Sequence, residues 1–149
     1  MTTINRRMLA IGLAVATVGL AGCATDQKPA SMTNLAATLR GSAEVPPVNV
    51  PGTGSAAVKL DKSTKTLSWT VTYGGLTGPV RAAHFHGPAA PTANAGVVVP
   101  ITVSASPMSG SAQLNDAQMA DLLAGRWYVN IHTAAHPGGE IRGQVTVAP

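Results

Sequence analysis

The sequence has very little cysteine: Cys23 is the only one among 149 residues. A single cysteine cannot form an intramolecular disulfide, although an exported protein would be free to use one. Two interpretations of Cys23 remain, a buried thiol of a cytosolic protein or a thiol reserved for the attachment of lipid. Its position close to the N-terminus favours the second interpretation.

Acidic side chains are also scarce, with six Asp and Glu against ten Lys and Arg. No two of these acids lie at a spacing suited to hydrolysis by paired carboxylates. The Gly-x-Ser-x-Gly motif and the phosphate-binding loop are absent as well. No basic patch with interleaved aromatic residues is present, which argues against nucleic acid as a partner. The composition therefore favours a binding or structural protein over an enzyme.

No apolar run near the N-terminus has the length of about 20 residues that a membrane-spanning helix needs. Two adjacent arginines instead precede an uncharged apolar run over residues 8–21, which is the pattern of a secretory signal peptide. The run leads into Leu-Ala-Gly-Cys at residues 20–23, which resembles the lipobox of bacterial lipoproteins. This resemblance implies that residues 1–22 are removed and that Cys23 is acylated.

An acylated Cys23 would anchor the chain to a membrane, since each buried methylene of an acyl chain contributes about 0.8 kcal/mol. Ala24 follows the cysteine and favours the outer membrane, with the domain facing the periplasm or the cell surface. Removal of Arg6 and Arg7 leaves eight basic and six acidic residues, so the formal charge falls from +4 to +2. The same two arginines also resemble a twin-arginine export signal, although ordinary signal-peptide charge is the favoured interpretation.

Beyond the cysteine, residues 23–34 are polar and without period, as in a flexible tether, and residues 35–149 follow as one domain. The domain falls into short alternating runs separated by turn residues. The clearest run, residues 67–73, places its apolar side chains on one face and its hydroxyl side chains on the other. The predicted fold is all-β, an antiparallel β-sandwich or Greek-key-like barrel of about eight strands with one short helix. The strands are expected at residues 35–41, 57–60, 67–73, 80–86, 97–103, 110–114, 127–132 and 141–147.

One segment, residues 116–124, has the pattern of a helix. Asn115 can cap its first turn, Gln118 stands where a capping box needs a glutamine, and Gly125 follows the last turn. Leu122 and the apolar residues around it are expected to pack this helix against the sheet.

Four sequence blocks, in this order, resemble the signature segments of the CHRD domain family, which is named from chordin. They are GSAEVPP at 41–47, AHFHGP at 83–88, WYVNIHT at 127–133 and PGGEIRG at 137–143. The resemblance covers residues 35–147 and implies an extracytoplasmic β-sandwich-like domain. It supplies no catalytic residues, and the signalling role of chordin depends on other modules that are absent here.

All four histidines lie in or beside two of these blocks. Residues two apart on a strand point to the same face, so His84 and His86 can direct both imidazoles at one point. If a neighbouring strand carries His132, the three nitrogens could hold copper or zinc. His136 is a possible fourth ligand. The alternative interpretation is that these histidines are packed, hydrogen-bonded residues that hold loops.

Glu140 and Arg142 alternate onto one face of the last predicted strand. They could orient a ligating imidazole through its second nitrogen, as metal sites commonly require. They could also form a surface ion pair worth about 0–1 kcal/mol. A buried structural role is the favoured interpretation.

Three functions follow from these patterns. The first is an envelope-anchored lipoprotein whose domain is a binding module for copper or zinc. The second is a structural or adhesive protein-interaction module that holds no metal. The third is a copper-dependent redox enzyme resembling superoxide dismutase, which needs an open coordination position on the metal.

Overall fold

The computed structural model describes residues 31–149. The predicted signal peptide, the lipidation site at Cys23 and most of the predicted tether lie outside the described residues. The structure therefore does not test these predictions. Among the described residues, no helix has the length and apolar character needed to cross a membrane.

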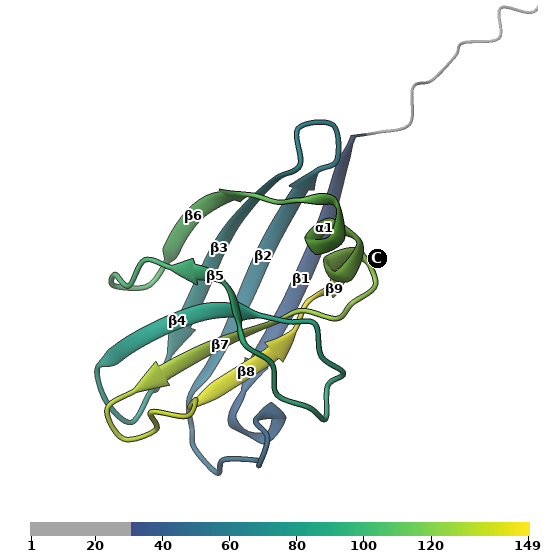
Figure 1. Cartoon of the computed structure of the whole chain (residues 1–149). Coiled ribbons are helices and arrows are strands. Elements are labelled where there is room, and N and C mark those ends of the chain that lie inside the picture. Colours follow the sequence, from purple (N-terminus) through teal and green to yellow (C-terminus); the bar gives the residue numbers. More distant parts are fainter. Residues whose placement is uncertain (1–30) are drawn as a thin grey trace, which may run out of the picture.

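Nine strands form one antiparallel sheet that curves into a nearly closed barrel (Figure 1). Eight of them follow the order β5-β4-β7-β8-β1-β2-β3-β6, and β9 pairs with β1. Because β5 and β6 are the unpaired ends of this order, the barrel stays open along one seam. The strands are β1 (Met32–Arg40), β2 (Thr53–Asp61), β3 (Thr66–Gly74), β4 (Val80–His86), β5 (Val97–Ile101), β6 (Met108–Gln113), β7 (Tyr128–Thr133), β8 (Ile141–Gln144) and β9 (Thr146–Val147).

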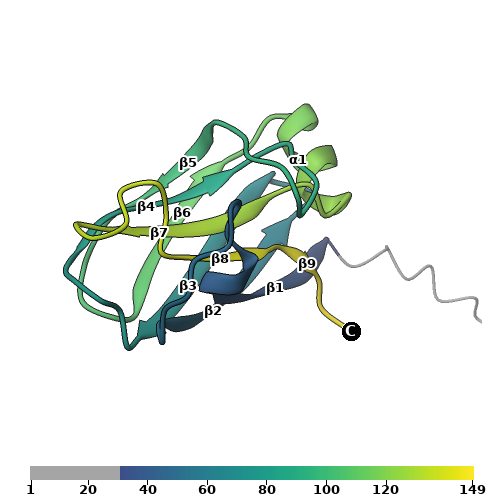
Figure 2. The same ribbon diagram turned by 90° about the horizontal axis from the view of Figure 1, so that it is seen from below.

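The all-β prediction is confirmed in its barrel form. Seen from below, β4 and β7 lie across the barrel from β1 and β2, and the continuous sheet joins these two sides (Figure 2). Alternation along each strand sends one set of side chains into the interior. On β3, for example, Leu67 and Val71 are fully buried and Trp69 is almost so. Their partners on β2 include Val58 and Leu60, which are equally buried.

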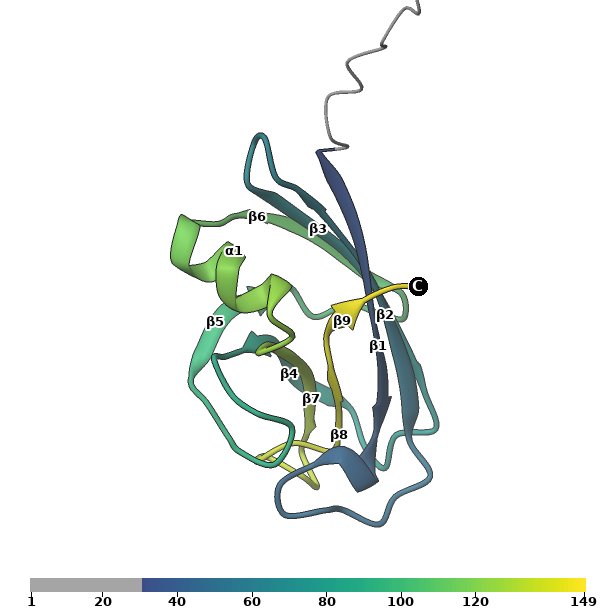
Figure 3. The same cartoon turned by 90° about the vertical axis from the view of Figure 1, so that its right-hand side faces the viewer.

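The helix α1 (Asp116–Leu123) begins as the sequence predicts. The Asn115 side chain accepts a hydrogen bond from the Gln118 amide, and the Gln118 side chain accepts one from the Asn115 amide. Gly125 has a φ of 69°, the left-handed conformation that commonly ends a helix. Leu122 is fully buried in the barrel core, so α1 packs against the barrel, where it contacts β9 (Figure 3).

The boundaries of β1 and β8 differ from the prediction. β1 starts three residues early, at Met32, because Met32 continues the ladder with Asp61 of β2. A short 3-10 turn at Gly41–Ala43 follows β1, and a Cβ at Gly41 would lie 2.4 Å from the Val48 carbonyl oxygen. The predicted strand over residues 141–147 is divided into β8 and β9 at Val145, whose amide donates to the Trp127 carbonyl instead.

Candidate metal centre

The candidate site lies on the outer face of β4 and β7, which are neighbours in the sheet although 48 residues separate His84 from His132. Phe85 of β4 and Ile131 of β7 point into the core and are fully buried. Because side chains alternate along a strand, the flanking histidines point the other way. The two-residue spacing therefore places His84 and His86 on one face, as the sequence predicts.

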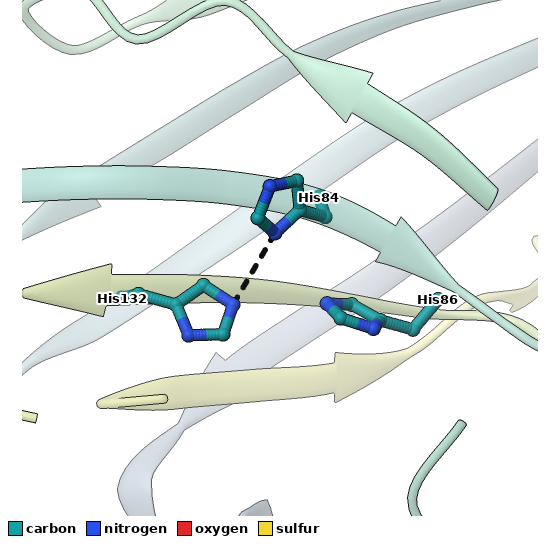
Figure 4. A group of neighbouring side chains, drawn as sticks. All are labelled: His84, His86 and His132. Atoms are coloured by element: carbon teal, nitrogen blue, oxygen red, sulfur yellow. Dashed lines mark hydrogen bonds between the residues drawn. The ribbon is translucent and has the colours of Figure 1, made fainter. Parts of the chain in front are cut away.

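The register between β4 and β7 brings the third histidine to the same place. Ala82 pairs with His132, and His84 pairs with Asn130, so His132 is the diagonal neighbour of His84. The Nδ1 atom of His84 lies 3.4 Å from Nε2 of His132. One nitrogen from each of His84, His86 and His132 lies within 4.8 Å of the other two, and the three rings surround a common point (Figure 4).

Backbone carbonyls determine which ring nitrogens are free. The Nδ1 atom of His86 lies 3.0 Å from the Ala95 carbonyl oxygen, and Nδ1 of His132 lies 3.0 Å from that of Pro137. A carbonyl only accepts, so in the neutral rings both Nδ1 atoms carry the proton and both Nε2 atoms keep a lone pair. The Nε2 atom of His86 is buried and has no hydrogen-bond partner. An orphaned lone pair directed toward two other imidazoles fits a metal ligand.

The surroundings keep these imidazoles neutral. Burial lowers the pKa of His84 below the ordinary value, and the neighbouring His132 and His86 lower it further. Burial is also the main cause of the lowered pKa of His86, to which the charges of His132 and Arg142 contribute. Burial lowers the pKa of His132 as well, although its bond to Pro137 opposes this. Metal ions bind the neutral form of histidine, so all three rings are suited to coordination at neutral pH.

The geometry can be compared with that of a metal bound by nitrogen. Two nitrogens at about 2.0–2.1 Å from a tetrahedral ion lie about 3.4 Å apart. The His84–His132 pair already has this separation of 3.4 Å. The remaining separations, up to 4.8 Å, need a contraction of the cluster through side-chain rotation. Three neutral nitrogen donors suit copper or zinc better than calcium or magnesium, which prefer oxygen ligands.

The family model of the CHRD domain matches residues 35–145 of the chain. The match covers most of the chain. The chain belongs to the CHRD domain family. Searches of curated proteins and of solved structures find no match. The family assignment therefore rests on the family model, and the function of this CHRD domain must be argued from its own residues.

The fourth histidine of the CHRD domain, His136, does not join this group. In the part of the chain that the structure describes, the group of His, Cys, Asp and Glu placed to hold a metal consists of His84, His86 and His132 alone. The His136 amide donates to the Thr133 hydroxyl in the turn between β7 and β8. The loop residues around it form a separate hollow with Glu44.

Glu140 is completely buried, and its hydrogen bonds link the β3–β4 connection to β7. Its carboxylate accepts hydrogen bonds from the Thr77 amide at 2.7 Å, the Thr77 hydroxyl at 2.9 Å and the Thr133 hydroxyl at 2.6 Å. Burial raises its pKa, but these hydrogen bonds outweigh burial and hold the pKa below the ordinary value. Glu140 thus joins the β3–β4 connection to β7 and makes no hydrogen bond with an imidazole.

Arg142 is 1% exposed and likewise makes no hydrogen bond with a histidine. Its guanidinium donates to the Asn94 side chain at 3.0 Å and to the Ala93 carbonyl at 2.8 Å. The favoured prediction, a buried structural role for Glu140 and Arg142, agrees with their burial. The imidazoles of His86 and His132 are oriented by backbone carbonyls, and the residue types in a sequence do not reveal such contacts.

Tyr128 lies beside the site, although the sequence predicts only that it belongs to a strand. Its ring stacks on the imidazole of His86, with centroids 5.0 Å apart and planes inclined by 5°. The two residues are directly paired across β4 and β7. The alternation of Tyr128, Asn130 and His132 along one face of β7 was the signal in the sequence that could have identified it.

Glu44 is a second residue that the sequence did not single out. It is 5% exposed, and burial raises its pKa to about 7, although Arg142 and Asn130 both act to lower it. The Asn130 amide donates to Glu44 Oε2 at 3.4 Å. Glu44 and Arg142 also line a cavity of about 460 Å³ beside the histidines' face of the barrel. The 41–47 block therefore covers part of this face.

Proposed function

We propose that this CHRD domain binds a transition metal ion, copper or zinc, through Nδ1 of His84 and the Nε2 atoms of His86 and His132. The observation that carries the proposal is the buried Nε2 of His86, which has no hydrogen-bond partner and lies in one group with the other two imidazoles. A buried polar atom without a partner costs about 1–3 kcal/mol, and coordination of a metal would offset this cost.

The donor set supports this class of metal. Imidazole nitrogen binds both zinc and copper, and intrinsic affinity follows the order in which Cu(II) exceeds Zn(II). Three protein ligands leave a further position for water or another small ligand on a bound ion. The chain's own contribution is to hold three imidazoles together on two adjacent strands and to keep the rings neutral.

Titration of the chain without residues 1–22, with Cys23→Ser, tests the proposal. We expect one equivalent of Cu(II) or Zn(II) to bind with a dissociation constant below about 1 μM, a binding free energy of about −8 kcal/mol or stronger. The triple variant H84A/H86A/H132A should lose this binding. H136A is the matched control, because it removes the histidine that lies outside the group. Equal binding by the wild type and the triple variant would disprove the proposal.

The two alternatives make different predictions in the same experiment. A structural or adhesive module would bind no metal, and its partners would be unaffected by the triple variant. A copper-dependent redox enzyme would bind copper and also turn over superoxide or an oxidisable substrate. Copper binding without turnover would exclude the enzyme and leave the binding module.

We also propose that the chain is exported, cut before Cys23 and held by lipid in the cell envelope, in the outer membrane. The support is the arrangement of charge, apolar run and Leu-Ala-Gly-Cys at the N-terminus. Mass spectrometry of the membrane-extracted protein should find an acylated N-terminal cysteine. Cys23→Ala should remove the acyl mass and release the chain from the membrane fraction. A wild-type protein with an unmodified Cys23 would contradict the proposal.

A further inference from the structure

Three side chains from three adjacent strands form a stack on the outer face of the barrel. Tyr128 lies on β7, between β4 with His86 and β8 with Arg142. The His86 imidazole is parallel to the Tyr128 ring within 5°, and the Arg142 Cζ atom lies 3.5 Å from the centroid of the same ring. Arg142 is 1% and Tyr128 2% exposed, so this cation–π contact is shielded from water.

Arg142 also holds the connection between β4 and β5, residues 87–96. Its guanidinium donates to the Asn94 side chain at 3.0 Å and to the carbonyl oxygens of Ala93 at 2.8 Å and Ala90 at 3.4 Å. Asn94 in turn donates to the Val45 carbonyl at 2.8 Å. The guanidinium of an arginine presents its donors in a rigid planar fork, a geometry that the compact ammonium group of a lysine does not reproduce.

The residue after Asn94 orients the histidine. The Ala95 carbonyl accepts from Nδ1 of His86 at 3.0 Å and from the Tyr128 hydroxyl at 3.3 Å. The Ala95 amide donates to the same hydroxyl at 3.1 Å. The position of Ala95 therefore depends on Tyr128 directly and on Arg142 through the segment next to it. His86 is constrained at its ring face by Tyr128 and at Nδ1 by Ala95.

We propose that Tyr128 and Arg142 are positioning residues of the metal centre, which hold His86 as the Nδ1–H tautomer with its Nε2 lone pair directed at the other imidazoles. This inference rests on the proposed function and names residues that act on it without touching the metal. Groups that orient a ligating imidazole typically change metal affinity about 10- to 100-fold when removed. The effect should be specific to His86, because neither residue contacts His84 or His132 through a hydrogen bond.

The variants Y128F, Y128L and R142K separate the parts of this arrangement. Y128F keeps the ring stack and removes the hydroxyl that binds Ala95. Y128L removes the stack as well, and R142K keeps the charge but removes the planar fork. R126K and Y73F are the matched controls: Arg126 pairs with Asp121 on the surface, and the Tyr73 hydroxyl binds the Ser104 carbonyl away from the site. If Y128L folds poorly by circular dichroism, Y128F and R142K carry the test.

Two readouts are needed, one of them without metal. Nitrogen-15 NMR of the metal-free chain reports the tautomer of each histidine, and we expect His86 to be the Nδ1–H form in the wild type. The Tyr128 and Arg142 variants should give a mixture of tautomers at His86, with His132 unchanged. In the second readout, Cu(II) affinity should fall about 10- to 100-fold, and the nitrogen hyperfine pattern in electron paramagnetic resonance should lose one imidazole or become heterogeneous.

The outcomes distinguish this inference from the proposed function. If the wild type binds metal and the variants keep both its affinity and its His86 tautomer, the positioning role is wrong. An equal loss of affinity in R126K or Y73F would also overturn it. If the wild type binds neither copper nor zinc, the proposed function fails, and the metal-free NMR alone decides whether Tyr128 and Arg142 orient His86.

Discussion

At the scale of residues, the three histidines of the site are not equivalent. The sequence suggests His84 and His86 as the natural pair, because they lie two apart on one strand. The structure instead gives an oriented Nε2 lone pair to His86 and His132, whose Nδ1 atoms each lie 3.0 Å from a backbone carbonyl. His84 has only the 3.4 Å contact with His132. A ligand without such support must be ordered when the metal binds, which costs side-chain entropy.

This difference predicts an order of importance among single substitutions. H84A should keep detectable Cu(II) binding, because two oriented ligands remain. H86A and H132A should each weaken binding about tenfold more than H84A, a difference of roughly 1.4 kcal/mol in binding free energy. Isothermal titration of the three variants under one buffer condition measures this order. Loss of binding in H84A alone would contradict it.

Glu44 predicts a pH dependence of stability in the metal-free domain. Burial raises the pKa of Glu44 to about 7 in the folded chain, against an ordinary value of 4.5, so the folded state binds more protons than the unfolded state between these two pH values. The contribution of Glu44 to the free energy of unfolding should therefore be greatest below about pH 4.5. It should fall by up to about 3 kcal/mol as the pH rises to 7. Burial of the carboxylate is the cause, and Arg142 and Asn130 offset it only in part.

The variant E44Q isolates this effect, because a neutral amide replaces the carboxyl group. The lowered pKa values of the three site histidines act in the opposite direction, since they make stability fall as pH drops below 6.5, but they act in both proteins. Urea unfolding at several pH values between 5 and 8, with a chelator present, should show E44Q gaining stability over the wild type as pH rises. Parallel curves for the two proteins would refute the assignment.

At the scale of elements, close approach between strands depends on glycine. β8 crosses beside β1, and a Cβ at Gly143 would lie 2.4 Å from the Thr38 carbonyl oxygen. That atom belongs to the backbone of β1 and cannot rotate away.

The start of α1, by contrast, depends only on residues that are neighbours in sequence. Its capping box was therefore predicted in full from Asn115 and Gln118.

We expect Gly143→Ala to destabilise the domain by about 1–3 kcal/mol, the usual cost of inserting a methyl group where no space exists. The strand β8 would move away from β1, and Arg142 would move with it. Gly74→Ala is the control, since a Cβ at this exposed strand residue meets no atom within 4 Å. Chemical denaturation of both variants measures the difference, and equal stabilities would show that the contact with Thr38 relaxes freely.

At the scale of the whole molecule, the candidate metal centre joins two strands that are distant in sequence but adjacent in the sheet. β4 and β7 are adjacent, and β8 joins β7 to β1. Unfolding separates the histidines, so a metal that binds only the folded chain should stabilise the entire barrel. The increase in the free energy of unfolding on metal binding therefore reports on the fold of the whole barrel.

Zinc at 100 times its dissociation constant should raise the free energy of unfolding by about 2.7 kcal/mol. For a domain of this size, that corresponds to an increase in Tm of roughly 10 °C. Differential scanning calorimetry with and without zinc measures it, and H136A should respond like the wild type. A thermal shift of the same size in H84A/H86A/H132A would place the stabilising ion elsewhere.

The sequence by itself determined the features that depend on near neighbours. Alternation predicted the strand 67–73 and the shared face of His84 and His86, and the capping residues predicted where α1 begins. Only the tertiary structure decided that β4 lies beside β7, that His132 completes the group, and that Ala95 and Pro137 orient the rings. The physical reason is that periodicity and capping are local, whereas strand order, register and the path of a loop depend on how the whole chain packs.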